Sequence, residues 1–243
     1  MIQLFEDISM LLSYASKLRN RNGEDFNLFH LLGAEYDEVR THSAIIADLL
    51  DPKGTHGQGN RYLNLYIEGL KSSVPELQYF DTSSALVFKE YFYKTKLDAG
   101  RIDIFIQDKD MRQVIIENKI QSGENNNQIE RYRKAYPKSL VIFLTLFGDD
   151  HNQANIIQSY HTEIYNWLEN CRKESIDLGV IKEAIAQYIY LIKKLTNRHI
   201  HSIMDKEIQQ RILRDENSLS NFLELTNYFD EIKRLIHIVF FKT

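Results

Sequence analysis

Hydrophobic and polar residues alternate in the middle of the chain and follow helical spacing on either side of it. The alternation predicts two strands at residues 101–107 and 113–120, joined by the polar break Asp108-Lys109-Asp110. Further on, the apolar and β-branched run at residues 139–147 is typical of a strand that is buried on both faces, as in a parallel pair.

A helix is predicted between the second and the third of these strands. It begins near Gln128, and Pro137 ends it because proline cannot continue a helix. A strand, a helix and a parallel strand form a crossover unit, so this helix is expected to pack on one face of the sheet. Outside this unit, residues 84–94 and 155–160 are predicted to be the first and the last strand.

Apolar residues three and four positions apart predict helices before and after the sheet. Their residues are 2–18, 26–32, 35–50, 62–70, 162–171, 181–195, 208–213 and 219–241. Asp25 and Gly33 are expected to cap the second helix at its two ends. The predicted fold class is α/β, with a mixed sheet, N-terminal helices and an all-helical C-terminal extension. The expected segments are residues 1–82, 83–172 and 173–243, packed as one compact unit.

Four ionisable residues are predicted to meet across the two central strands. A hairpin centred on Asp110 sets Asp103 opposite Glu117 and Arg101 opposite Lys119. Directly opposed residues have Cβ atoms roughly 4.5–5.5 Å apart. Two carboxylates at that distance repel each other unless a divalent cation lies between them or one is protonated. The alternative is an ion network in which Arg101 and Lys119 neutralise the two acids without a metal.

The helix after these strands adds two side chains on one face. Gln128 and Tyr132 are four residues apart, and we expect this face to lie near the carboxylates. Together, Asp103, Glu117-Asn118-Lys119 and the pair Gln128 and Tyr132 resemble the motifs of the PD-(D/E)XK nuclease superfamily. The last pair resembles the Gln-x-x-x-Tyr motif of the RecB-like and phage exonuclease-like branches.

This resemblance implies a restriction-endonuclease-like core and a metal-dependent phosphodiesterase. It makes Asp103 and Glu117 the metal ligands, with the backbone carbonyl of Asn118 as a further ligand. Lys119 would orient or deprotonate the attacking water, or stabilise the developing negative charge. Hard oxygen ligands favour Mg²⁺ or Mn²⁺ over zinc.

The resemblance also gives Gln128 and Tyr132 catalytic roles. Gln128 would hold Lys119 or a phosphate oxygen by hydrogen bonds. Tyr132 would stack on a base or bond to a phosphate. The alternative for Tyr132 is a packing role under the sheet.

Three residues outside these motifs are further candidates. Glu38 and His42 share a face of a predicted helix, and the superfamily often places an acid or a histidine near the metal from such a helix. The alternative for both is an acidic helix face exposed to solvent, with a surface histidine. Glu90, on the first strand, is either another acid near the metal or, as we favour, a charge that protects the edge of the sheet.

The composition limits the class of protein. The net charge of −4 excludes a non-specific polycation, so a nucleic acid would have to bind through local basic patches and metal ions. The single cysteine, Cys171, excludes an internal disulfide and fits a cytoplasmic protein. No secretory signal is visible, and the apolar runs are far shorter than a membrane span of about 20 residues.

The resemblance therefore implies a metal-dependent nuclease, and we expect a deoxyribonuclease. The usual roles of the superfamily suggest defence against foreign DNA, or phage and repair processes. The alternative is a catalytically inactive nuclease-like module that binds nucleic acid or a protein partner. The apolar C-terminal helices could also form a homodimer or hold a partner protein.

Overall fold

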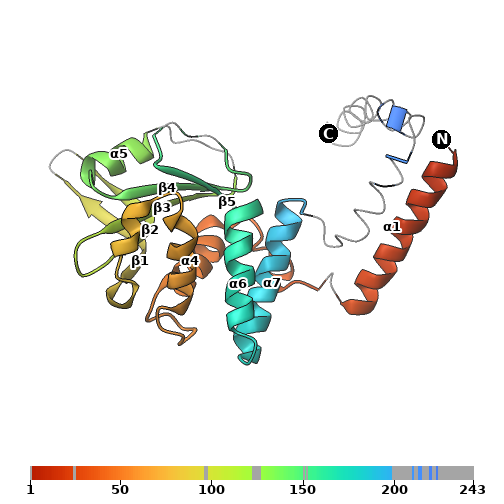
Figure 1. Cartoon of the computed structure of the whole chain (residues 1–243), viewed down its shortest axis with the longest axis horizontal. Coiled ribbons are helices and arrows are strands. Elements are labelled where there is room, and N and C mark those ends of the chain that lie inside the picture. The colour runs from red at the N-terminus through yellow and green to blue at the C-terminus, as the bar shows by residue number, and fades with distance from the viewer. Residues whose placement is uncertain are drawn as a thin grey trace. The chain divides into compact units, whose positions relative to one another are not determined.

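The computed structural model describes residues 2–23, 26–95, 98–121, 127–149, 151, 153–198, 210, 213–214, 219–220 and 223 (Figure 1). The chain divides into two units, of which Asn27–Arg198 is the larger. Met1–Phe26 and His199–Thr243 make up the other. The three segments proposed from the sequence, with boundaries at residues 82 and 172, stay a prediction.

Five strands form one mixed sheet in the larger unit, which confirms the predicted α/β fold class. The strands lie in sequence order, antiparallel from β1 to β3 and parallel from β3 to β5. They are β1 Leu86–Lys94, β2 Ala99–Gln107, β3 Gln113–Lys119, β4 Leu140–Thr145 and β5 Ile156–Ser159. The predicted crossover is present, because α5 connects the parallel strands β3 and β4.

The hairpin of β2 and β3 has the predicted register. Ile104 pairs with Ile116 and Gln107 with Gln113, which centres the hairpin on Asp110. Continued by one residue, this register places Asp103 opposite Glu117.

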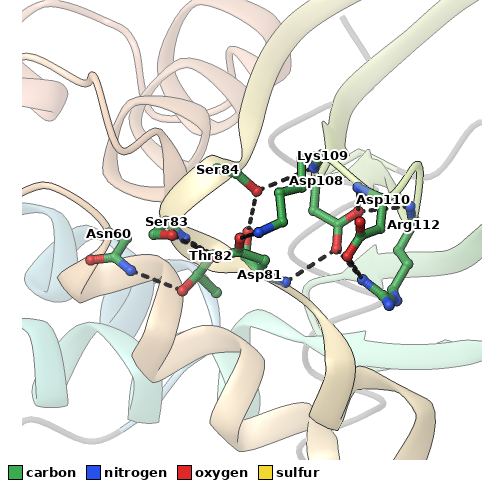
Figure 2. A network of polar contacts seen from close by, with 9 residues as sticks. All are labelled: Asn60, Asp81, Thr82, Ser83, Ser84, Asp108, Lys109, Asp110 and Arg112. Carbon is green, nitrogen blue, oxygen red and sulfur yellow. Dashed lines mark hydrogen bonds and ion pairs between the residues drawn. The ribbon is translucent and has the colours of Figure 1, made fainter.

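The hairpin turn is held by the buried carboxylate of Asp108 (Figure 2). Its Oδ1 accepts hydrogen bonds from the backbone N–H groups of Asp110 (3.0 Å) and Arg112 (2.8 Å). Its Oδ2 accepts from the backbone N–H of Asp81 (3.1 Å) and from Arg112 Nη1 (2.9 Å). Lys109 Nζ lies 3.0 Å from Asp81 Oδ2 and adds a second link to the segment before β1. These bonds fix the turn and, with it, the register of the two central strands.

Helices cover both faces of the sheet (Figure 1). Ile104 and Ile116 pack into the larger apolar cluster, with residues of α3, α4, α6 and α7. Phe105 and Ile115 point to the other face, where they pack with Ile129 of α5. The helices are α3 Ser43–Leu50, α4 Arg61–Lys71, α5 Gln128–Ala135, α6 Tyr165–Glu174 and α7 Gly179–Leu195.

The shorter elements correct some predicted boundaries. The helix predicted at residues 35–50 starts only at Glu38, with the π-helical turn η1 Glu38–His42 ahead of α3. In this turn the backbone N–H of Ser43 donates to the carbonyl of Glu38, five residues earlier. A second π-helical turn, η4 Tyr160–Ile164, precedes α6 in the same way. Two 3₁₀ turns, η2 Pro75–Tyr79 and η3 Thr82–Ser84, lie between α4 and β1.

The N-terminal helices are α1 Ile2–Asn22 and α2 Leu28–Leu31. Asn27, not Asp25, caps α2, because its side chain accepts hydrogen bonds from the backbone N–H groups of Phe29 and His30. Gly33 ends this segment with a positive φ of 64°, as predicted.

The predicted helices at residues 208–213 and 219–241 lie almost entirely outside the described residues. Within the described part of the chain, no helix combines the length and the apolar character that a membrane span requires.

Candidate active site

The two central strands separate where the predicted acids lie. The pairing of β2 with β3 stops at Ile104 and Ile116, although β2 begins at Ala99 and β3 ends at Lys119. Backbone groups that are no longer paired between the two strands form hydrogen bonds with side chains instead. Asp103 Oδ2 accepts from the backbone N–H of Asn118 at 2.8 Å.

Asp103 and Glu117 face each other across this gap, and their negative charges repel each other. Burial, and then the charge of Glu117, raises the pKa of Asp103 to about 7. Glu117 is only 1% exposed. Burial raises the pKa of Glu117, and the nearby Lys119 partly offsets the rise. The repulsion expected between the two acids is therefore present in the folded chain.

Lys119 lies beside this pair. Its Nζ is 3.1 Å from Glu117 Oε1, and its side chain is 23% exposed. Burial by itself lowers the pKa of Lys119. The charge and hydrogen bond of Glu117, together with the charges of Asp103 and Glu38, outweigh that effect, and the net pKa is raised. Lys119 is therefore a cation at neutral pH. This favours stabilising negative charge or orienting a water over removing a proton from it.

Tyr132 reaches from α5 into the gap between the strands. Its hydroxyl lies 2.8 Å from Glu117 Oε2 and 2.7 Å from the carbonyl oxygen of Arg101. The ring is 1% exposed, which favours the packing role of Tyr132 over the expected stacking on a base. Gln128 Nε2 lies 3.4 Å from the Tyr132 hydroxyl, and its expected contact with Lys119 or a phosphate oxygen stays a prediction.

Glu38 approaches the same end of β3 from η1. Its Oε1 accepts hydrogen bonds from the backbone N–H groups of Ile120 (2.9 Å) and Gln121 (3.0 Å). The charge of Glu38 also contributes to the raised pKa values of Glu117 and Lys119. Glu38 therefore lies near the acids, but its described bonds hold the chain that follows β3.

Both ring nitrogens of His42 contact other parts of the protein. The side chain is fully buried, with Nε2 2.9 Å from the carbonyl oxygen of Glu35 and Nδ1 2.9 Å from the hydroxyl of Tyr188. Both ring nitrogens thus have protein partners, and burial lowers the pKa of His42. These contacts favour a structural role for His42 over the expected metal role.

A buried polar network behind β3 was not foreseen from the sequence. The side-chain amide of Asn118 donates to Ser43 Oγ at 3.0 Å, and the Tyr160 hydroxyl donates to Asn118 Oδ1 at 2.8 Å. Tyr188 and His42 belong to the same network, through the bonds of Tyr188 to Tyr160 and to His42. One signal was available, because an asparagine pointing into a core from a strand requires partners. The network ties the strand that carries Glu117 and Lys119 to η1, α3 and α7.

A comparison with protein families agrees with this geometry. A family model described as the PD-(D/E)XK nuclease superfamily matches residues 26–190, more than half of the chain. The chain belongs to the PD-(D/E)XK nuclease superfamily. No curated protein and no solved structure matches the chain.

Membership of the PD-(D/E)XK nucleases confirms the resemblance and implies nuclease activity on a nucleic acid. Nucleases of this superfamily typically use divalent metals. The assignment to the Gln-x-x-x-Tyr branch stays a prediction, as do the individual catalytic and metal-ligand roles.

The acids of this PD-(D/E)XK site fit a divalent cation. Glu117 Oε1 is buried and has no hydrogen-bond partner within the described residues, although Lys119 Nζ lies close to it. Among the same residues, no three histidine, cysteine or acidic side chains form a complete metal cluster. Two carboxylates completed by waters and a phosphate are a ligand set typical of Mg²⁺. Asp103, Glu117 and the Asn118 carbonyl are therefore the candidate ligands, with Glu38 next to them.

Proposed function

We propose that this protein is a metal-dependent deoxyribonuclease that hydrolyses phosphodiester bonds with Mg²⁺ or Mn²⁺. One observation supports this most directly. Asp103 and Glu117 face each other where β2 and β3 separate, and the only polar contact described for the buried Glu117 Oε1 is Lys119 Nζ at 3.1 Å. Such a pair is unfavourable alone and favourable around a cation.

Each residue of the site has a distinct proposed role. A bound Mg²⁺ or Mn²⁺ would polarise the phosphate and make a bound water more acidic. Asp103, Glu117 and the Asn118 carbonyl would hold the ion. Lys119 would stabilise the negative charge that develops on the phosphate, because it is already protonated at neutral pH.

Gln128 and Tyr132 would act as positioning residues in this proposal. Tyr132 contacts both Glu117 and the backbone of β2, so it sets the separation of the two strands. Gln128 in turn contacts the Tyr132 hydroxyl. Partners of this kind fix the orientation of a ligating carboxylate and tune its affinity for metal.

The choice of substrate and setting is also a proposal. The Gln-x-x-x-Tyr resemblance supports DNA over RNA, and the superfamily's usual roles support defence against foreign DNA, or phage and repair processes. The free, buried Cys171 is compatible with the cytoplasm, where thiols stay reduced.

The test is cleavage of linear and circular DNA, single- and double-stranded, with Mn²⁺, Mg²⁺ or EDTA. Wild type should cut only with metal, and Lys119→Ala should lose roughly a hundredfold or more in rate. Lys138→Ala is a matched control, since this exposed lysine precedes β4 at the opposite end of the sheet from Lys119. RNA of the same sequence tests the substrate preference.

Two outcomes would contradict the proposal. Cleavage that persists in EDTA would exclude the metal-dependent mechanism. A wild-type protein that binds DNA but cuts nothing with any of these ions would favour the inactive binding module.

A further inference from the structure

Arg101 lies beside the candidate acids but takes no part in the mechanism proposed above. It precedes Asp103 by two residues on β2, so the two side chains leave the strand on the same face. Its backbone carbonyl is fixed by the hydroxyl of Tyr132 at 2.7 Å. Its side chain, in contrast, is 69% exposed. Arg101 is therefore an anchored residue with a guanidinium that is accessible at the site.

The ion pair of Arg101 is weaker than those of the other cations near the site. Arg101 Nη1 lies 3.6 Å from Glu90 Oε2, which is beyond hydrogen-bond distance. By comparison, Lys119 lies 3.1 Å from Glu117, and Arg131 lies 2.6 Å from Asp98. An exposed and loose ion pair contributes little free energy, so its cation can change partner at low cost.

Glu90 completes a row of acids across three strands. Its neighbours Lys89 and Tyr91 pair with Ile104 and Ile102, which places Glu90 next to Asp103 on the adjoining strand. The charge of Glu90 makes a small contribution to the raised pKa of Asp103. Its φ of 53° is unusual for a residue other than glycine.

This row of acids poses an electrostatic problem for an anionic substrate. Each phosphate of a nucleic acid carries a negative charge and would approach Glu90, Asp103 and Glu117 together. The protein as a whole has a net charge of −4, so its overall electrostatic field does not attract a nucleic acid. A local cation must therefore supply part of the attraction.

We propose that Arg101 binds a backbone phosphate of the nucleic acid next to the one that is cleaved, and that Glu90 holds Arg101 until the phosphate displaces it. The inference rests on the proposed nuclease function and names a contact of the same site. A guanidinium can donate two parallel hydrogen bonds to a phosphate, which Lys119 cannot do. Contacts of this kind position the nucleic acid without recognising its base sequence.

The test is binding of a short fluorescein-labelled DNA, single- or double-stranded, at several salt concentrations. Ca²⁺ replaces Mn²⁺, so that binding is measured apart from cleavage. Arg101→Ala should bind roughly tenfold more weakly, and its slope of log affinity against log salt should fall by about one. Arg101→Lys should lie between this variant and wild type.

Glu90→Gln should change binding in the opposite direction. It removes a negative charge from the path of the phosphate and frees Arg101, so affinity should rise by a few-fold. Arg61→Ala is the matched control, because Arg61 is an exposed arginine on α4, whose core residues pack on the other face of the sheet. It should bind like wild type, and thermal unfolding of each variant checks that it is folded.

The outcomes separate this inference from the proposed function. Unchanged affinity and salt slope in folded Arg101→Ala, with a wild type that cuts DNA, would overturn the inference alone. Loss of cleavage in Glu90→Gln, with Arg101→Ala unchanged in binding, would instead make Glu90 a metal ligand. A wild type that cuts nothing with Mn²⁺ or Mg²⁺ contradicts the proposed function, whatever Arg101 does.

Discussion

At the scale of single residues, the ionised carboxylate of Asp103 is destabilised by its surroundings in the absence of metal. Its carboxylate is half-buried and faces Glu117, and its pKa is raised to about 7. An acid whose pKa is higher in the folded than in the unfolded chain binds protons more tightly when folded. The contribution of Asp103 to the stability of the metal-free protein should therefore fall as pH rises from about 4 to 7 and then level off.

Asp103→Asn should stabilise the metal-free protein at pH values above about 7. We expect a gain of about 2 kcal/mol in the free energy of unfolding, because partial solvent exposure reduces the full effect of the pKa shift. This corresponds to a rise of roughly 4–8 °C in the melting temperature, measured by calorimetry in EDTA. The gain should shrink as pH falls and vanish below about pH 4, where the carboxyl becomes protonated in the unfolded state as well.

The second part of this prediction concerns the effect of metal binding on stability. Mn²⁺ should raise the melting temperature of the wild type at neutral pH and have little effect on Asp103→Asn. Asp149→Asn serves as the control, since Asp149 is exposed in the turn after β4. A wild type more stable than Asp103→Asn in EDTA at neutral pH would contradict the account of the two acids.

At the scale of elements, the β2–β3 hairpin depends on one buried side chain, that of Asp108. It accepts three backbone hydrogen bonds and one from Arg112, and these bonds lower its pKa although burial alone would raise it. A lowered pKa means that this carboxylate stabilises the fold above its unfolded pKa. The stabilisation is lost as pH falls through its folded pKa.

Asp108→Asn should therefore destabilise the protein by about 3 kcal/mol at neutral pH. Urea unfolding measures the loss, which should become smaller in acid. Asp110→Asn is the control, because Asp110 also pairs with Arg112 but is 51% exposed and should cost less than about 1 kcal/mol. Equal losses in the two variants would show that the buried carboxylate does not fix the turn.

At the scale of the whole molecule, two independent observations give nearly the same boundaries for the part of the chain that holds the candidate site. The compact unit Asn27–Arg198 holds the sheet and the candidate site, and the superfamily match spans residues 26–190. We predict that a chain of residues 27–198 folds cooperatively and keeps the metal-dependent cleavage of the full chain, within about threefold. Circular dichroism and the DNA cleavage assay test both parts.

The predicted self-association involves the C-terminal helices. If the apolar C-terminal residues form a dimer, light scattering should find a dimer for the full chain and a monomer for residues 27–198. A full chain that is monomeric at the same concentration would remove the dimer proposal. An unfolded shortened chain would show that the terminal segments are part of the fold.

The sequence by itself determined the strands, the crossover helix and the register of the central hairpin. These features depend on residues close together in the chain. Alternation decided which face Asp103 and Glu117 occupy, and the polar turn at Asp108-Lys109-Asp110 set the pairing. Because the acids lie on this one hairpin, the main part of the candidate site could be predicted without knowledge of any distant contact.

Only the tertiary structure decided the roles of the residues around that pair. His42 meets Tyr188 from 146 positions away, and Asn118 meets Ser43 from 75 positions away. Helical spacing could place His42 on a face but could not say what that face packs against. Likewise, the burial of Tyr132 and the separation of β2 from β3 follow from how α5 docks on the sheet. Local patterns encode period and turn chemistry, whereas the partners of a buried polar group depend on the packing of elements remote in sequence.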